Sequence, residues 1–334
     1  MVNVLMAGCI IVLLLGVIAH IYPQKLHLDV RFLSKNHTDI IKGVGIFIIV
    51  ISHIGNFSGA RYFTFLGGIG VALFLICSGF GLYKSYEKTG LDDFFKKRLF
   101  KVIIPYWVLV IAYYIINPSE FTMLALISNI LLVSTVNAYT WFVQFIILLY
   151  IMFYLVYRFV PENKRIPFIG LLSIMFFLLV KNGLWAEQAF SFLIGISFAK
   201  YSKDKIPVSK ARLIGCSTLI LGIVSLFIKQ LPVIRNSNYL VFNGVQVVLK
   251  IAIAIGIIYL TYLLLRFSLS KIFAFAGTVS YEIYLVHTLF IFIVINGFTK
   301  INLIMYIMVC CLAVYVFYIV NKILLKQRRV VKKM

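Results

Sequence analysis

The stretch "HTDIIKGVGIFIIVISHIG", residues 37–55, has the length and apolar character of a membrane-spanning helix, which needs roughly 20 residues. It nevertheless contains Asp39, Lys42 and His53. Ionisable side chains are costly inside a bilayer and usually serve a function there. The stretch therefore predicts a spanning helix with a functional polar face.

The spacing of these three side chains places them on one stripe of the helix. His53 follows Lys42 by eleven residues, which at roughly 100° per residue returns to nearly the same face, roughly 16 Å further along the axis. Asp39 lies within about 40° of that face. The alternative is that Asp39 and Lys42 extend to the membrane interface and that His53 forms a hydrogen bond between helices.

The whole chain has the composition of a membrane protein. Of its 334 residues, 63% are hydrophobic and 13% are charged, whereas soluble domains carry about 25% charged residues. Apolar runs recur along the chain and are continuous rather than alternating, which favours helices over a barrel. We therefore expect an all-α, polytopic integral protein of the cell (plasma or inner) membrane. The richness in Ile, Lys and Phe favours a bacterium of low GC content.

The net charge of +22 could suggest binding to nucleic acid. Lys and Arg, however, cluster in short segments between apolar runs, and no basic module interleaved with aromatic residues lies outside them. We therefore expect a lipid bilayer as a partner and no nucleic acid. The five cysteines fall in apolar runs without Cys-x-x-Cys spacing, so neither a disulfide nor a metal site is predicted.

Twelve apolar runs define the candidate spans: 3–22, 39–57, 66–84, 102–116, 120–135, 141–160, 166–183, 185–201, 212–231, 239–266, 279–297 and 301–325. The run 120–135 is short and polar at both ends, so we assign it to the outer interface, which leaves about ten or eleven spanning helices. This choice places 26 of the 32 Lys and Arg on one side. The positive-inside rule then puts the N-terminus outside and the C-terminus in the cytoplasm. A single domain is predicted over 1–334, with a core at 35–325 and a basic tail at 326–334.

A second polar helix face lies in "VSYEIYLVHTLF", residues 279–290. His287 is one helical turn from Tyr284, and Glu282 precedes both. Two histidines, two acids and a lysine in apolar runs together predict a polar interior.

Lys250 lies in the middle of the run 239–266, beside Asn243 and Gln246. It is either a charge partner for Glu282 or part of a cavity for the acceptor substrate. The sequence leaves both alternatives open.

Four motifs resemble, in the same order, those of the membrane-bound acyltransferase-3 family. They are Lys42-x10-His53 preceded by Asp39; "GGIGVALFLICSGFGL" at 67–82, with Ser78, Gly79 and Phe80; "FFKKRLFKVIIPYW" at 94–107, with Arg98, Leu99, Lys101, Val102, Pro105 and Tyr106; and "YLVH" at 284–287. Each motif alone is weak, but together they are specific and cover most of residues 35–290.

The sequence departs from the family pattern in two places. Lys101 stands where arginine is usual, and the stretch at 140–150 has Trp141, Phe142 and Gln144 without the acidic residues of many members. It is similar there to the shorter branch of the family. No hydrolase-like domain follows the last predicted span, so we expect a stand-alone acyltransferase unit.

The resemblance implies a transfer reaction. Members of the family move an acyl group, most often acetyl, from cytoplasmic acyl-CoA to a hydroxyl of an extracytoplasmic carbohydrate, such as an exopolysaccharide, a capsule or a lipid-linked sugar. Acyl-CoA is then the donor substrate, and no tightly bound cofactor is expected. Cations clustered at the inner face suit the phosphates of CoA.

The motif positions and the residue types together give an expected role to each polar side chain. The predicted catalytic residues are His53 as general base, with Glu282 and His287. The predicted donor-binding residues are Lys42, Arg98, Lys101, Asp39 and Ser78. The predicted acceptor-binding residues are Trp141, Gln144, Tyr284 and Lys250.

Other interpretations remain at this point. A transporter of polysaccharide or lipid-linked sugar would also need a polar interior, although no internal repeat is visible. A structural subunit of a synthase complex is a third class. The glycine-rich helix at 67–82 could serve close helix packing alone, and Trp141 could be only an interfacial anchor.

Overall fold

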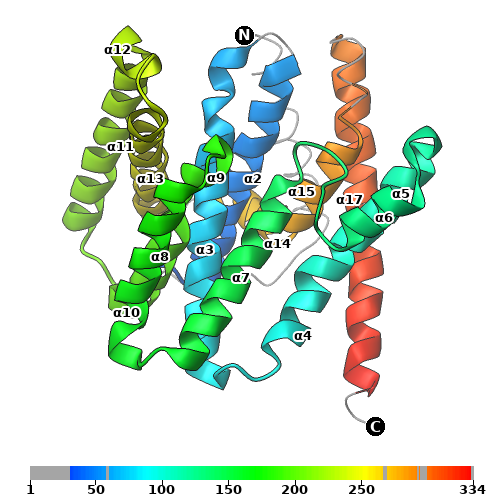
Figure 1. Cartoon of the computed structure of the whole chain (residues 1–334), viewed down its shortest axis with the longest axis horizontal. Helices are drawn as coiled ribbons and strands as arrows, with labels where there is room; N and C mark the ends of the chain where they lie inside the picture. The colour runs from blue at the N-terminus through cyan, green and yellow to red at the C-terminus, as the bar shows by residue number, and fades with distance from the viewer. Residues whose placement is uncertain (1–30, 58–59, 266–268, 292, 294–298, 332–334) are drawn as a thin grey trace. The chain divides into compact units, whose positions relative to one another are not determined.

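The computed structural model describes residues 31–57, 60–265, 269–291, 293 and 299–331. Over these residues the chain is helical and contains no strand (Figure 1). Seven of the described helices are long and apolar enough to cross a membrane, or eight if α14 (Leu269–Thr278) and α15 (Ser280–Leu289) form one broken span. The predicted all-α, polytopic class is therefore confirmed, while the orientation of the termini stays a prediction.

Two predicted spans are shorter in the structure than the sequence pattern indicates. The runs 166–183 and 185–201 form three separate helices of 15, 4 and 11 residues, namely α8 (Arg165–Leu179), α9 (Gly183–Ala186) and α10 (Ser191–Tyr201). None of them reaches the roughly 20 residues that a spanning helix needs. The cause is the polar stretch after α8, where the Asn182 side chain accepts the Leu184 amide at 3.1 Å and starts a new helix.

Two further predicted runs bear on the number of spans. The run 120–135 contains only the eight-residue helix α6 (Met123–Ile130), in agreement with the expectation that it does not cross. The run 3–22 lies outside the described residues. The predicted number of about ten or eleven spans therefore exceeds the seven or eight found in the described part of the chain.

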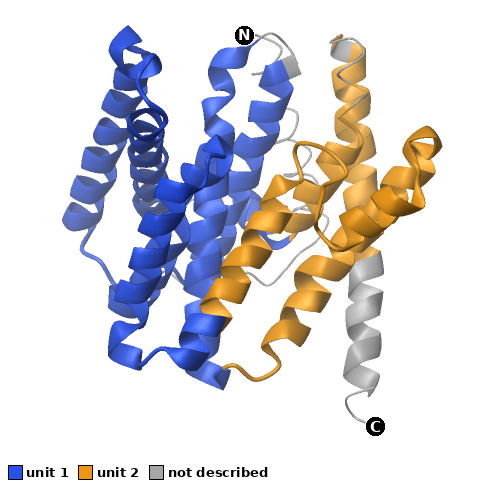
Figure 2. Cartoon of the chain, viewed as in Figure 1, with its two compact units in different colours: residues 1–90, 155–278 blue, residues 91–154, 279–334 orange. Residues whose placement is uncertain are grey.

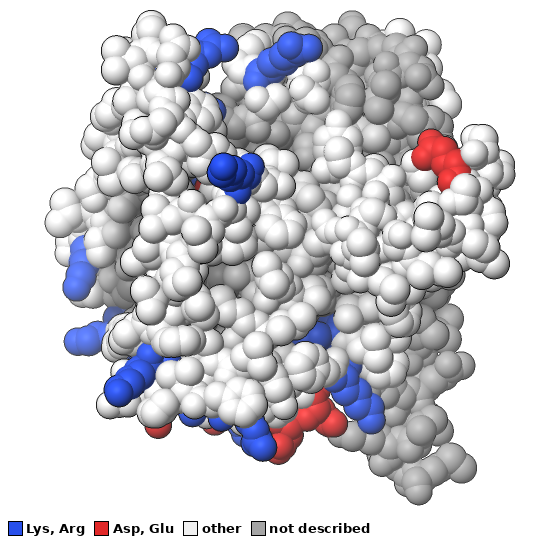
Figure 3. Space-filling view, in the orientation of Figure 1, with Lys and Arg blue, Asp and Glu red and all other residues white. Residues whose placement is uncertain are grey.

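The chain divides into two compact units, each built from two separated stretches (Figure 2). Unit 1 comprises Met1–Gly90 and Leu155–Thr278, and unit 2 comprises Leu91–Tyr154 and Val279–Met334. On the face drawn in Figure 3, most Lys and Arg side chains lie toward the borders of the face, and most of its middle is uncharged. This distribution suits helices that are surrounded by lipid.

The helices of unit 1 pack through glycines. Beside α8, α9, α10 and α14, the unit contains α2 (Lys35–Phe57), the 3-10 turns η1 (Arg61–Phe63) and η4 (Glu162–Lys164), α3 (Phe65–Thr89), α11 (Val208–Gln230), α12 (Pro232–Arg235) and α13 (Tyr239–Leu263).

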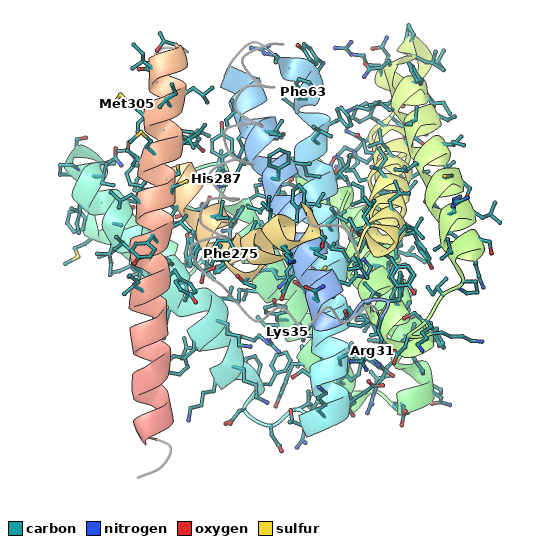
Figure 4. The ribbon with its side chains drawn as sticks, turned by 180° about the vertical axis from the view of Figure 1, so that it is seen from behind. Arg31, Lys35, Phe63, Phe275, His287 and Met305 are labelled. Carbon is teal, nitrogen blue, oxygen red and sulfur yellow. The ribbon has the colours of Figure 1, made fainter. Side chains whose placement is uncertain are left out.

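Helices α2 and α3 run antiparallel, and Figure 4 labels Lys35 and Phe63 at opposite ends of this pair. A Cβ added at Gly67 would lie only 2.7 Å from the Ser52 Oγ, and one at Gly70 would lie 2.6 Å from the Gly45 carbonyl oxygen. The absence of side chains on these glycines therefore permits the close contact between α2 and α3.

Helix α3 also crosses α10 at glycines. An added Cβ at Gly79 would overlap the carbonyl of Phe192, and one at Gly195 would overlap the carbonyl of Ile76. The glycine-rich helix that the sequence singled out is thus a packing element on at least two sides. Gly81 of the same helix is exposed and would meet nothing within 4 Å.

Helix α13 is tied to the first turn of α2 by a buried histidine. The Nδ1 atom of His37 accepts the Leu33 amide at 2.9 Å, so the ring carries its proton on Nε2, which lies 3.1 Å from the Thr261 Oγ1 and 3.2 Å from the Ile258 carbonyl. The rings of Phe32 and Tyr262 pack around it. His37 is therefore a structural residue of unit 1.

Unit 2 contains an irregular helix near the basic motif. Its described elements, besides α6 and α15, are α4 (Phe94–Arg98), the π-helical turn η2 (Leu99–Ile103), α5 (Ile104–Ile116), the 3-10 turn η3 (Pro118–Glu120), α7 (Trp141–Phe159, as far as Tyr154) and α17 (Lys300–Val331). The Tyr281 hydroxyl of α15 donates to the Val102 carbonyl in the π-helical turn at 2.9 Å. The hydroxyl of Tyr306 in α17 donates to the His287 carbonyl at 3.2 Å.

The two glycines of α3 give a matched test of the packing. We expect Gly79→Ala to destabilise the protein, because overpacking against a backbone carbonyl typically costs about 1–3 kcal/mol. Gly81→Ala should stabilise it by up to about 1 kcal/mol, because alanine favours the helix and space is open. Thermal unfolding in detergent measures both. Equal unfolding midpoints for the two variants would contradict the close crossing of α3 and α10.

Candidate active site

The first polar motif, Asp39, Lys42 and His53, lies on α2, and its two ends have different surroundings. Lys42 Nζ lies 2.6 Å from Asp39 Oδ1, and Asp39 is buried. The partner of Asp39 is therefore Lys42, three residues further along the same helix. The pair neutralises both charges in the first half of the helix.

His53 lies further along α2, beside the start of α3. The neighbouring Ser52 is buried, and its hydroxyl donates to the Thr64 carbonyl at 2.9 Å. Together with the close approach of Gly67, this bond fixes the turn that carries His53. His53 itself is partly exposed, whereas the other histidines in the described part of the chain, His37 and His287, are 0% and 1% exposed. His53 is thus the most exposed imidazole among the described histidines.

Lys250 of α13 forms an ion pair with Glu187, which lies between α9 and α10. Both side chains are almost completely buried, with 5% and 6% of their surface exposed. Glu282 had been one expected partner for Lys250, and the structure assigns the lysine to Glu187 instead. The signal for Glu187 in the sequence is a lone acid in an otherwise apolar stretch, and sequence reasoning missed it.

The residue after Glu187 joins the same cluster. Gln188 is completely buried, its Nε2 donates to the Gly68 carbonyl at 2.8 Å, and its Oε1 accepts the Ser191 hydroxyl at 3.1 Å. A Cβ added at Gly68 would lie 2.9 Å from Lys250 Nζ. The start of α3, the α9–α10 connection and the middle of α13 therefore meet at one polar cluster within unit 1.

The second predicted motif lies on α15 in unit 2. His287 Nδ1 lies 2.9 Å from the Ile283 carbonyl, to which it can only donate, so Nε2 is the nitrogen with the lone pair. The Tyr284 hydroxyl donates to the Tyr139 carbonyl at 2.6 Å, and its ring centre lies 5.9 Å from that of His287. Glu282 is partly exposed in the first turn of α15, where the helix dipole favours an acid.

The basic motif of unit 2 presents one arginine between aromatic rings. The guanidinium of Arg98 lies 5.3 Å from the ring centres of both Phe94 and Tyr150. Its Nε is buried and has no hydrogen-bond partner among the described residues. Lys101 is exposed on the π-helical turn that follows. The planar guanidinium contacts two aromatic rings, and its Nε–H has no acceptor among the described residues. These features suit the binding of an anion.

The remaining predicted residues occupy more ordinary positions. Trp141 is partly exposed at the start of α7 and packs against Phe145. The Gln144 amide donates to the Leu132 carbonyl at 2.8 Å and so fixes the loop before α7. Ser78 is partly buried on α3.

Comparison with known proteins agrees with these motifs. The acyltransferase domain of the acyltransferase-3 family matches residues 35–322. No curated protein and no solved structure matches the chain. The family match and the seven apolar helices together indicate a helical membrane acyltransferase. The chain belongs to the acyltransferase-3 family.

The buried ion pair yields a prediction about stability. We expect Glu187→Gln alone to destabilise the protein by about 3–5 kcal/mol, because it leaves a buried lysine without its counter-charge. The double variant Glu187→Gln/Lys250→Met should recover most of this loss. Thermal unfolding in detergent is the measurement. A single variant as stable as the wild type would show that the pair does not form.

Proposed function

We propose that the protein is an O-acyltransferase that moves an acyl group, most often acetyl, from cytoplasmic acyl-CoA to a hydroxyl of an extracytoplasmic carbohydrate. Family membership supports the acyltransferase class. The observation that carries the proposal is the partly exposed His53 in the second half of α2, where it is the one titratable side chain after the Asp39–Lys42 ion pair. This arrangement provides a partly exposed imidazole on an otherwise apolar stretch of helix.

In the proposed reaction, His53 accepts the proton of the acceptor hydroxyl. The hydroxyl oxygen then attacks the thioester carbonyl carbon, a C–O bond forms, and the C–S bond breaks. The departing CoA thiolate takes the proton from the imidazolium, so protons and charge balance at the end. General-base catalysis of this kind contributes typically about 10²–10⁴ in rate.

On the donor side, the phosphates of CoA are proposed to bind Arg98 and Lys101. The rings on Arg98 hold its guanidinium in place, and its buried Nε is available to a phosphate oxygen. Lys42, Asp39 and Ser78 are proposed to contact the donor along α2 and α3. The segment 84–101 carries six Lys or Arg, so the positive-inside rule favours its placement in the cytoplasm, where acyl-CoA is made.

The acceptor is proposed to bind near the end of α2 that carries His53. His53 lies four residues before Phe57, the last residue of that helix. Trp141 and Gln144 at the start of α7, Tyr284 and Lys250 are the proposed acceptor contacts, with Glu282 and His287 as further catalytic candidates. The burial of His287 favours a role in positioning rather than proton transfer.

Replacement of the base tests the chemistry. We expect His53→Gln to lower acyl transfer by about 10²–10⁴-fold, because an amide cannot accept the proton. Transfer of labelled acetyl from acetyl-CoA by purified protein is the measurement, with thermal unfolding as a check of folding. Asn56→Ala, at an exposed position one turn later, should keep wild-type activity. A folded His53→Gln protein with wild-type activity would remove the histidine from the mechanism.

Replacement of Arg98 tests the donor site. We expect Arg98→Ala to raise the KM for acyl-CoA by about 10–100-fold, since charge-assisted hydrogen bonds contribute about 1.5–3 kcal/mol. Arg98→Lys should have an intermediate effect, because lysine keeps the charge and loses the planar contact with the rings. Lys96→Ala, which removes one exposed charge from the same segment, should change KM less, and only at low salt. An unchanged KM for Arg98→Ala would exclude this residue from the donor site.

A further inference from the structure

Polar side chains follow one face of α13 from near its start to its middle. Asn243, Gln246 and Lys250 are spaced by three and four residues, so they share that face. They are only 4%, 8% and 4% exposed. Three buried polar residues on a helix of such apolar composition are costly unless they have partners.

The opposite wall of this face comes from the connection between α8 and α10 and from the start of α3. A Cβ added at Gly183 would lie 3.4 Å from the Asn243 Oδ1. At the level of Lys250 the wall consists of Glu187, Gln188 and the bare backbone of Gly68. We call the set of Asn243, Gln246, Lys250, Glu187 and Gln188 the polar stripe.

Most of the polar stripe is satisfied by the protein. Glu187 pairs with Lys250, both ends of the Gln188 amide are bonded, and the Asn243 Nδ2 donates to the Tyr239 carbonyl at 2.8 Å. The exception is Gln246, whose Oε1 is buried and accepts no hydrogen bond from the described residues. An unfilled buried acceptor costs about 1–3 kcal/mol, so this oxygen is suited to a donor from a ligand.

The polar stripe ends close to the turn that carries His53. On α3, Gly68 faces Lys250, and the preceding residue, Gly67, faces Ser52. Ser52 is the neighbour of His53 in α2. Gly67, Gly68 and His53 are all partly exposed, so the surface beside the buried cluster is accessible. A molecule lying along the stripe would have one end near the proposed base.

We propose that the polar stripe is the binding subsite for the hydroxyl groups of a neutral sugar acceptor. This inference rests on the proposed acyl transfer and adds where, and in what chemical form, the acceptor binds. The Gln246 oxygen accepts a sugar hydroxyl, and Lys250 donates to a sugar oxygen. A phosphate or carboxylate is disfavoured, because Glu187 already neutralises the lysine and would repel a second anion.

The test separates a role in binding from a role in folding. Gln246→Leu removes an oxygen that has no partner in the protein, so its unfolding midpoint should equal or exceed that of the wild type. Its KM for the acceptor should rise about tenfold, the effect of one hydrogen bond at the upper end of the usual range, with KM for acetyl-CoA unchanged. Val248→Leu, on the exposed face of α13, is the matched control and should change neither value.

The assay uses protein in lipid nanodiscs, because glycoside detergents would occupy the site. The acceptor probes are methyl N-acetylglucosaminide and chitotriose, compared with glucuronate as an anionic sugar, and release of free CoA is measured with and without each. Stimulation by the neutral sugars, reduced in Gln246→Leu, supports the proposal. Unchanged acceptor KM, loss of folding in Gln246→Leu, or preference for glucuronate would overturn it. So would CoA release that no sugar stimulates, whereas no acetyl-CoA turnover of any kind would instead refute the proposed transferase function.

Discussion

The pairing of Lys250 with Glu187 is the constraint on which the arrangement of unit 1 depends. A lone ammonium in the middle of an apolar helix would be severely penalised, so a carboxylate must be brought to it. That carboxylate comes from a stretch between α9 and α10, and the absence of a side chain on Gly68 leaves room beside it for the Lys250 side chain. Three features therefore serve the same ion pair: the interruption after α8, the glycine at the start of α3 and the polar face of α13.

The same requirement explains why α2 can carry a reachable histidine. Asp39 and Lys42 form a pair, His37 is hydrogen-bonded through both ring nitrogens, and the remaining charge, Lys35, is exposed at the first residue of the helix. The helix therefore carries no unpaired buried charge before His53. The bond from Ser52 to the Thr64 carbonyl then holds the last turns against α3. The proposed base, His53, therefore lies on a well-anchored element, and a fixed position is what general-base catalysis needs.

Sequence patterns predicted much of this structure, because the bilayer imposes long apolar helices and marks each buried charge as an exception. The polar residues of α2 and the non-spanning run that contains α6 followed from spacing and length alone. The division of 166–201 into three short helices did not, because its apolar content resembles two spans and Asn182 is a weak local signal. The role of Glu187 was missed for a different reason: periodicity on one helix cannot reveal a partner that comes from a distant connection. For the same reason, the sequence could not predict the unpartnered Gln246 oxygen or the aromatic rings that contact Arg98.

The order of Glu187 and Lys250 along the chain has a consequence for biogenesis. Synthesis delivers the acid to the membrane before the base, so Glu187 must wait in a low-dielectric environment without its counter-charge. The ion pair forms only once α13 is in place, because Lys250 lies on that helix. The packing around Glu187 is therefore completed late, when α13 joins unit 1.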